Sequence, residues 1–202
     1  MRVSRLERQK KRSHRVSVYI DDEFFVGLTE SALMRSGLTV GQELSQQEKQ
    51  ELLDLANYDT AREKALGLLA RRPRSQWELE LYLKRKSYEE PTIEALIQDL
   101  SAAGHIDDVA FARWWVEQRR LLKSASKNKL KLELRQKRVR DNIIKEVLDE
   151  DATEDIVVIR ELIQKKQQQS RYRDKQKLMQ YLARQGFHYG DIKAAFQDDD
   201  DI

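Results

Sequence analysis

The sequence predicts a mainly α-helical protein. It would consist of three tandem three-helix repeats of helix-turn-helix type in an elongated arrangement, preceded by a small β-hairpin with helices. Glycine and proline make up only 9 of the 202 residues, under half of their usual share of about 12%. Turns are therefore few, and the remainder, rich in Leu, Glu, Lys, Arg and Gln, favours helices. The second observation is an internal repeat, which is typical of an array of similar structural units.

Each copy of the repeat has a leucine pair at i and i+4, an apolar residue five positions later, and then an isoleucine. The copies are Leu79, Leu83, Tyr88 and Ile93; Leu130, Leu134, Val139 and Ile143; and Leu178, Leu182, Phe187 and Ile192. Leucines four residues apart lie on one face of a helix. The apolar residue follows a helix end and the isoleucine opens the next helix, so each copy predicts a long, a medium and a short helix.

Signals at helix ends delimit these elements. Capping boxes are predicted at Thr60–Glu63 and Ser75–Glu78, and N-caps at Asp107, Asp141 and Asp174. Gly104 and Gly186 suit the left-handed position after a helix. The predicted helices cover residues 59–71, 75–86, 91–102, 107–123, 127–137, 141–149, 153–168, 174–185 and 189–197.

The first 58 residues follow a different pattern. Apolar residues alternate with other residues over 16–20 and again over 24–28, on either side of Asp21–Glu23, which predicts a β-hairpin without the glycine that a tight turn prefers. A short helix from Thr29 and another after Ser45 follow. The predicted organisation is a basic arm (1–15), a hairpin and helical extension (16–58), three repeats (59–106, 107–150 and 151–197) and an acidic tail (198–202).

Composition excludes several classes of protein. The chain has no cysteine, which excludes disulfides, thiolate metal sites and a cysteine nucleophile. No apolar run approaches the roughly 20 residues of a membrane span, and the N-terminus lacks the apolar core of a signal peptide. We therefore expect a cytoplasmic protein that makes no contact with a membrane.

Catalytic motifs are absent as well. The sequence contains no phosphate-binding glycine loop, no HExxH and no GxSxG, and His14, His105 and His188 are not spaced as ligands. Asp107–Asp108 has the chemistry to hold Mg²⁺, but its place before a helix favours an N-cap and a first-turn acid. Trp77 is a candidate for stacking on bases, whereas Trp115 shares a helical face with Phe111 and is expected in the core. We expect no enzyme activity, no metal and no cofactor.

Charge is the most informative property, because it is arranged in blocks. The formal net charge is +3. Residues 1–15 contain seven basic residues and one acid, and residues 116–140 contain ten basic residues and two acids. Residues 141–162, in contrast, contain two basic residues and eight acids. Such blocks indicate a basic face for nucleic acid and an acidic face for protein, although long helices also use charge simply as a solvated surface.

The basic residues predict a binding surface on the first two repeats. Its members are Arg71, Arg72, Arg74, Lys86, Arg119, Arg120, Lys123, Lys127, Lys129, Lys131, Arg135, Lys137, Arg138 and Arg140. A helix-turn-helix protein that binds duplex DNA is the alternative function. The predicted third helices are short, and the one from Asp141 is acidic, which disfavours base-specific reading but leaves salt-sensitive phosphate contacts open.

Several spaced motifs are shared with a known family. The segments are Ala65–Leu79 with Leu83 and Lys86, Gly104–Ala112, and Tyr181–Ile192. They resemble the RecX family, bacterial modulators of the RecA recombinase, and the hairpin and Gly37–Gly41 resemble the N-terminal extension of its longer members. The resemblance covers nearly the whole chain. Three departures are Arg138 in place of a turn glycine, Lys123–Ser126 without the usual glycine, and Asp21–Asp22 in place of Asp-Gly.

The resemblance implies a non-enzymatic protein that binds in the groove of the RecA–single-stranded DNA filament. It implies that strand exchange, ATP hydrolysis and coprotease function are restrained. The expected partners are the RecA filament and single-stranded DNA, with double-stranded DNA as a further candidate, and the expected state is a monomer.

Overall fold

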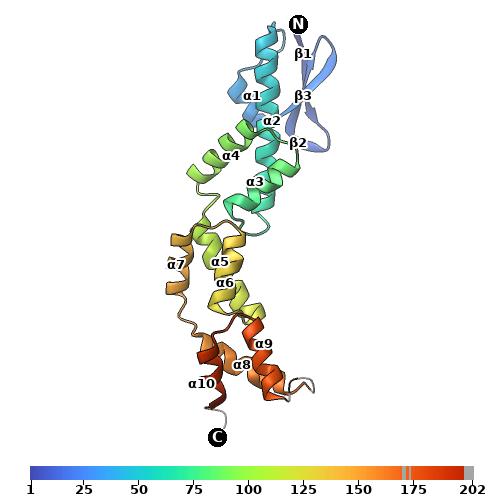
Figure 1. Ribbon diagram of the computed structural model, residues 1–202. Coiled ribbons are helices and arrows are strands. Elements are labelled where there is room, and N and C mark those ends of the chain that lie inside the picture. The colour runs from blue at the N-terminus through green and yellow to red at the C-terminus, as the bar shows by residue number, and fades with distance from the viewer. Residues whose placement is uncertain (170–171, 173, 198–202) are drawn as a thin grey trace. The chain divides into compact units, whose positions relative to one another are not determined.

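The computed structural model describes residues 1–169, 172 and 174–197, except for the side chain of Lys123. The predicted acidic tail lies outside the described residues. Figure 1 shows a small sheet followed by a series of helices. The elements are β1 (Val3–Gln9), β2 (Arg12–Ile20), β3 (Glu23–Thr29), α1 (Glu30–Ser36), α2 (Gln46–Leu69), α3 (Gln76–Arg85), α4 (Glu90–Ala102), α5 (Asp108–Lys123), α6 (Lys127–Gln136), α7 (Asp141–Glu150), α8 (Asp155–Gln167), α9 (Lys175–Arg184) and α10 (Tyr189–Gln197).

The chain divides into two compact units. The first contains Met1–Arg72 and Leu79–His105, and the second contains Pro73–Glu78 and the chain from Ile106 onward. The first unit therefore combines the sheet, α1, α2 and α4 with most of α3. The second combines the start of α3 with α5 to α10.

The predicted hairpin is confirmed, and a strand that was not predicted extends it. β2 pairs antiparallel with β3, with Val18 opposite Val26, and β1 pairs with the other edge of β2. Asp21 and Asp22 adopt φ of 47° and 69°, so two aspartates occupy the left-handed turn positions that usually favour glycine or asparagine. Residues 1–15, predicted as a basic arm, contain β1 and the start of β2. β1 was missed because its charged residues obscure the alternation.

One face of the sheet packs on α1 and α2. The buried residues of this core are Val3, Val18, Ile20, Leu28, Ala32, Leu38, Leu44, Leu52 and Ala56. They come from the sheet, from α1, from the segment between α1 and α2 and from α2 itself, so the hairpin does not stand alone. This agrees with the marginal stability of an isolated hairpin in water.

The helix α2 is longer than predicted and joins the N-terminal sheet to the first repeat. The predicted helix after Ser45 is confirmed and begins with a capping box of Ser45 and Glu48. The predicted helix start at Thr60 is wrong, because Thr60 and Glu63 lie inside α2. Their side chains contact Arg15 of β2 instead. A Thr and a Glu three residues apart also share a helix face, so the pattern marks a helix start only where the helix is interrupted beforehand.

A buried carboxylate makes a second connection to the sheet. Asp59 of α2 is 5% exposed and accepts hydrogen bonds from the backbone N–H and the hydroxyl of Thr29, both at 2.8 Å. Glu63, one turn later, binds Arg15 and His14. Burial alone would raise the pKa of Glu63, but the hydrogen bonds from His14 and Arg15 outweigh it and lower that pKa.

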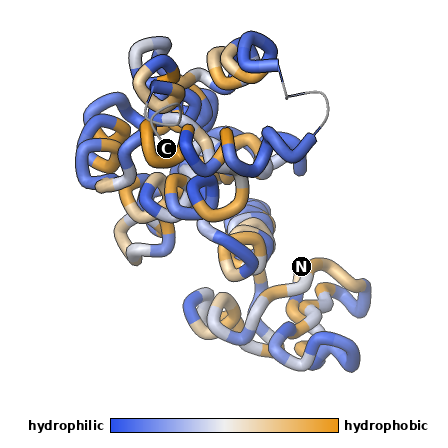
Figure 2. The backbone as a smooth tube through the Cα atoms, turned by 90° about the horizontal axis from the view of Figure 1, so that it is seen from below, coloured by the Kyte–Doolittle hydropathy of each residue, from blue (hydrophilic) through white to orange (hydrophobic). Residues whose placement is uncertain are grey.

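The three tandem three-helix repeats are confirmed. They consist of the end of α2 with α3 and α4, of α5 to α7, and of α8 to α10. The repeated leucine pairs are almost fully buried in every copy. In the second unit, α5 to α7 and α8 to α10 each surround their own apolar cluster. The alternation of hydrophilic and hydrophobic residues along these helices is visible in Figure 2.

The same turn ends the second helix of each repeat. A residue with left-handed backbone follows the helix, and the next N–H reaches back to the second leucine of the pair, as in a Schellman motif. The left-handed residues are Ser87 (φ 60°), Arg138 (φ 57°) and Gly186 (φ 87°). The bonds are Tyr88 N to Leu83 O at 3.3 Å, Val139 N to Leu134 O at 3.2 Å and Phe187 N to Leu182 O at 3.3 Å.

Aspartates start several helices, as predicted, with one correction. Asp107 and Asp174 accept hydrogen bonds from the first turns of α5 and α9. Asp141 is the first residue of α7 and not its N-cap, which is Arg140; the Asp141 carboxylate binds Arg135 instead. A carboxylate near a helix start satisfies free amides or favours the helix dipole from either position, so its exact role depends on the partners within reach.

Candidate nucleic-acid interface on the second repeat

The basic residues predicted as a binding surface have three different environments. One group is used inside the second unit, where it joins the second repeat to the third. The side chain of Arg120 is 10% exposed and donates to Asp151 Oδ2 at 2.8 Å and to Asp155 Oδ1 at 3.1 Å. Lys127 Nζ donates to the carbonyl of Asp151, and Lys129 Nζ donates to Gln185 Oε1 at 2.7 Å. These three cations therefore have structural partners.

Hydrogen-bond partners lower the pKa of a carboxylate at this junction. Burial raises the pKa of Asp151, but hydrogen bonds from Arg120 and Thr153 outweigh the burial and lower it below the usual value. Asp155 also accepts the backbone N–H of Lys127 with both carboxylate oxygens at 3.0 Å. The half-buried Arg120 guanidinium therefore has both carboxylates as partners, as a buried charge requires.

A second group surrounds Trp115. The indole of Trp115 donates to Glu133 Oε2 at 2.9 Å, and Arg119 donates to the same oxygen at 2.7 Å. The guanidinium carbon of Arg119 lies 4.4 Å from the centre of the indole ring, and Lys137 Nζ lies 5.1 Å from it. Lys137 Nζ also binds Glu78 at 2.6 Å. Trp115 packs on the core beside Phe111, as predicted.

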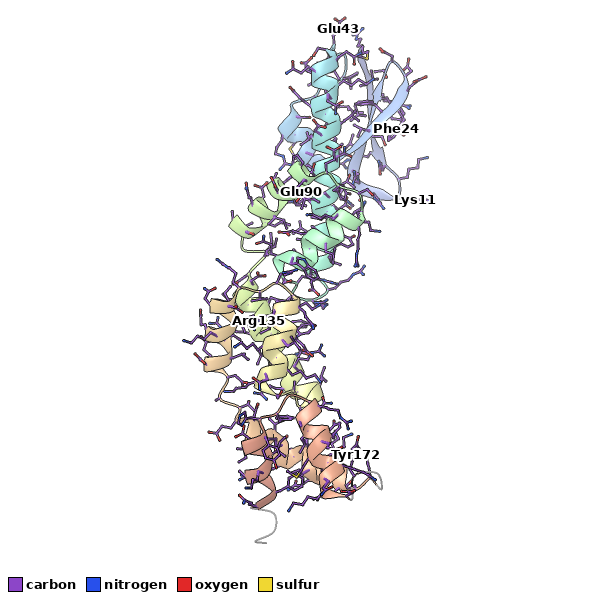
Figure 3. All side chains as sticks on the ribbon, in the orientation of Figure 1. Lys11, Phe24, Glu43, Glu90, Arg135 and Tyr172 are labelled. Atoms are coloured by element: carbon purple, nitrogen blue, oxygen red, sulfur yellow. The ribbon has the colours of Figure 1, made fainter. Side chains whose placement is uncertain are left out.

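The third group is exposed at the α6–α7 turn. Lys131, Arg138 and Arg140 are exposed, and within the described chain the side chain of none of the three makes a hydrogen bond or ion pair. Arg135 is also exposed and binds Asp141 at 2.8 Å, with half or more of each side chain in contact with solvent. The hydrogen bond from Arg135 holds the pKa of Asp141 below its usual value. An exposed pair of this kind contributes little to stability and opens easily for a competing anion. Figure 3 labels Arg135 on the second repeat.

The predicted binding residues of the first repeat differ in exposure and do not all belong to one unit. Arg71 and Lys86 are exposed, and Lys86 Nζ lies 5.9 Å from the ring of Tyr82. Arg72 and Arg74 are half-buried and have interactions within the protein. Arg71, Arg72 and Lys86 belong to the first unit, and Arg74 to the second. The side chain of Lys123 lies outside the described residues.

Two of the exposed cations, Lys131 and Arg135, line a groove between α6 and α7 with a volume of about 390 Å³. Its lining residues are Lys127, Asn128, Lys131, Arg135, Asp141, Ile144, Lys145, Leu148 and Asp149. Lys145 and Asn128 were not predicted as site residues. Lys145 lies one helical turn after Asp141, so only the boundaries of α7 reveal that it faces the groove.

The third helix of the second repeat presents acids to solvent. Asp141, Glu146, Asp149 and Glu150 of α7 are exposed, with Lys145 as the only exposed cation of that helix. In a helix-turn-helix protein this helix enters the major groove of DNA. An acidic surface there repels the phosphate backbone.

The two acids considered as Mg²⁺ ligands accept hydrogen bonds from backbone N–H groups at helix starts. Asp107 caps α5, and Asp108 Oδ1 accepts the N–H of Gln76, the first residue of α3, at 2.9 Å. The interpretation of Asp107–Asp108 as helix-start acids is confirmed. In the part of the chain that the structure describes, no three His, Asp or Glu side chains converge as metal ligands would.

Among the described residues, no helix is both long and apolar enough to cross a bilayer.

The N-terminal region and all three repeats match models of one protein family. Residues 1–45 match the model of the regulatory protein RecX N-terminal domain, and residues 61–100, 107–148 and 153–196 match the models of the first, second and third RecX three-helix domains. The chain belongs to the RecX family. The match to the second RecX domain spans α5, α6, the α6–α7 turn and most of α7, and so includes the exposed cations.

Relatives and solved structures agree with this assignment. A regulatory protein RecX of Clostridioides difficile is 29% identical and covers 95% of this chain and 92% of its own length. One of Amycolatopsis mediterranei is 35% identical over 145 residues, which are 69% of this chain and 83% of the relative. A crystal structure of a regulatory protein RecX has the same fold, with a TM-score of 0.76 at 23% identity over 97% of this chain and 98% of that one. The crystal structure of RecX from Lactobacillus salivarius gives 0.63 at 25% identity over 72% and 98%.

Proposed function

We propose that this protein regulates the RecA recombinase without catalysing a reaction of its own. It binds the RecA–single-stranded DNA filament in its groove and mostly inhibits recombinase, ATPase and coprotease activity. The support is membership of a family of regulatory proteins together with the absence of catalytic motifs from the sequence. Acting on a DNA filament in the cytoplasm, the protein needs neither a membrane nor a cofactor.

The observation that supports the binding surface best is the group of exposed cations at the α6–α7 turn. We assign Lys131, Arg135, Arg138 and Arg140 to it, with Lys145 from the neighbouring helix. These side chains can approach phosphates without breaking a buried pair, because only Arg135 has a partner among the described residues and that pair is exposed. Contacts to phosphate release counterions, so binding weakens steeply as salt rises.

The cations with structural partners are removed from the proposed contact surface. Arg120, Lys127 and Lys129 are engaged at the junction with the third repeat, and Arg119 and Lys137 are engaged around Trp115. Arg71 and Lys86 of the first unit are exposed and are proposed as separate contacts of the first repeat. Among the acids of α7, Glu146 and Glu150 pair with Arg113 and Asp141 pairs with Arg135. Asp149 is exposed and can attract basic groups of the filament, since complementary charge speeds and orients association.

The test is the single-stranded-DNA-dependent ATPase of the host's own RecA, titrated with this protein at fixed salt. We expect inhibition at less than one molecule of this protein per RecA molecule. No effect even in excess would contradict the proposed function. Sedimentation of the protein alone tests the proposed monomer in the same buffer.

A charge-reversal variant tests the surface separately. Lys131→Glu, Arg138→Glu and Arg140→Glu together change the net charge by six units at exposed positions. The matched control reverses Lys165, Arg184 and Lys193, which are exposed on α8, α9 and α10. We expect the first variant to lose inhibition and the control to retain it. Equal inhibition by both variants would mean that net charge, and not this surface, determines binding.

Duplex DNA binding of the helix-turn-helix type is the alternative. The succession of three helices with a tight turn before the third favours it, whereas the acids exposed on α7 oppose it. A footprint on a defined duplex site that survives competitor DNA would establish this alternative, and its absence would leave the filament as the target.

A further inference from the structure

The outer face of the N-terminal sheet has a row of three side chains that the proposed function does not use. Arg5 of β1, Tyr19 of β2 and Phe24 of β3 are paired across the strands. The rings of Tyr19 and Phe24 meet edge to face with their centres 5.9 Å apart, and the guanidinium carbon of Arg5 lies 4.1 Å from the centre of the Tyr19 ring. This row lies on the face opposite the apolar core of the sheet.

The row is open to solvent. Phe24 is 60% exposed and the Arg5 side chain 57%. Figure 3 labels Phe24 on the side of the sheet away from α2. A sheet that buries one face usually has polar residues on its other face. The core of this sheet therefore does not explain the exposed aromatic rings. An exposed phenylalanine flanked by a tyrosine and an arginine is therefore a surface available for a planar ligand.

Cations lie on the same two strands, toward the β1–β2 turn. Lys10, Lys11 and Arg12 are exposed in and next to that turn, whereas Arg8 pairs with Glu30 of α1. Arg12 precedes Tyr19 by seven residues on β2, which corresponds to about 23 Å along an extended strand. The acids near these strands are Glu7, which lies 3.7 Å from Arg5, Glu30, which pairs with Arg8, Glu63 of α2, which binds His14 and Arg15, and Asp21–Glu23 at the opposite hairpin end. A bound anionic chain would therefore run from the aromatic pair toward the Lys10–Lys11 turn.

We propose that this face binds single-stranded nucleic acid. A base stacks on the ring of Phe24 beside Tyr19, and Arg5 and the cations of the β1–β2 turn contact the phosphates. An aromatic platform on an antiparallel sheet with a basic border is suited to a single strand, because every base has a face to stack and the backbone supplies the charge. The site is separate from the α6–α7 surface and does not require RecA.

Mapping the contact uses the full-length protein and a 15-nucleotide oligothymidine that contains 5-iodouracil. Irradiation at low salt, followed by mass spectrometry of the digested complex, should identify cross-links at Phe24 or Tyr19. Cross-links confined to other segments would overturn the proposal.

Fluorescence anisotropy tests the stacking itself. Phe24→Leu and Tyr19→Leu keep an apolar side chain but remove the ring, and each should weaken binding of the oligothymidine at least about fivefold. An abasic oligomer of equal charge should bind the wild type more weakly and be insensitive to both substitutions. Phe24→Trp keeps a ring and should retain affinity, which separates loss of stacking from loss of folding. Met34→Ala, at a position 77% exposed on α1, is the control and should not change binding.

Two binding results would also overturn the proposal. One is wild-type affinity of both leucine variants for the oligothymidine, as expected if the face serves a protein partner or none. The other is equal affinity of the wild type for the oligothymidine and the abasic oligomer, which would mean contact by charge alone. Inhibition of the RecA ATPase is measured independently, so either proposal can fail while the other stands.

Discussion

The second repeat uses its basic residues differently at its two ends. At the junction with the third repeat, Arg120 is 10% exposed and pairs with Asp151 and Asp155. At the α6–α7 turn, Arg138 and Arg140 are exposed, and within the described chain no side chain pairs with them. Both ends belong to a single basic block in the sequence, so charge density alone does not distinguish a structural cation from one available to a partner.

The turns of the second and third repeats differ in a related way. Gly186 lies under the second repeat, where a Cβ would come within 2.9 Å of Ser126 Oγ. Arg138 has the same left-handed backbone but points to solvent. A left-handed position that is covered by a neighbour requires glycine, whereas an exposed one tolerates a side chain at a cost of about 1–2 kcal/mol. The exposed turn is therefore where the repeat can place a cation.

The largest effect is expected for Arg120→Met. Removing the guanidinium leaves Asp151 and Asp155 without their buried partner, which should lower the free energy of unfolding by about 3–5 kcal/mol. Urea unfolding followed by circular dichroism measures this. The control is Arg138→Met, where the same change at an exposed position should have little effect on stability. Equal stability of the two variants would contradict the contrast between the two ends.

Gly186→Ala should have the next largest effect. The left-handed backbone penalises a Cβ by about 1–2 kcal/mol, and the contact with Ser126 adds about 1–3 kcal/mol of overpacking. Gly104→Ala is the matched control, since Gly104 has φ of 71° but nothing within 4 Å of the added carbon. We expect the melting temperature to fall further for Gly186→Ala. A smaller fall than for Gly104→Ala would mean that the turn accommodates the methyl group.

Replacing the turn arginine should have a smaller effect of opposite sign. Arg138→Gly removes the strain of a left-handed arginine and should stabilise the protein by about 0.5–1 kcal/mol. It should also weaken contact with the RecA filament, which the ATPase titration detects. Ser87→Gly, at the same position of the first repeat, should stabilise similarly without that loss. A destabilised Arg138→Gly variant would show that the side chain has a structural role.

The smallest effect concerns acid stability. The pKa of Asp151 is lowered in the folded state, because the hydrogen bonds from Arg120 and Thr153 outweigh burial. Its contribution is thus fully present above the ordinary pKa of about 3.9 and is lost as the pH falls below about 4. Asp151→Asn should reduce the dependence of stability on pH in this range. An unchanged pH profile would mean that other carboxylates dominate acid unfolding.

Much of the helical framework could be predicted from the sequence. The leucine pairs, the apolar residue after each turn and the caps at Asp107 and Asp174 are local signals, and the observed repeats follow them. The continuous α2 and the strand β1 could not be predicted in this way. Thr60 and Glu63 imitate a capping box but contact Arg15, a partner 45 or more residues away, and β1 has too few apolar residues to show a period.

The sequence by itself determined the fold class, the three repeats and the position of the basic block, because hydrophobic spacing and charge are properties of neighbouring residues. Only the tertiary structure decided which cations are available. Arg120, Lys127 and Lys129 find acceptors supplied by residues 151–155 and Gln185, whereas Arg138 and Arg140 face solvent. The outer row of Arg5, Tyr19 and Phe24 likewise exists only once three strands are paired. Partners distant in sequence set the environment of each charge, and no local pattern records them.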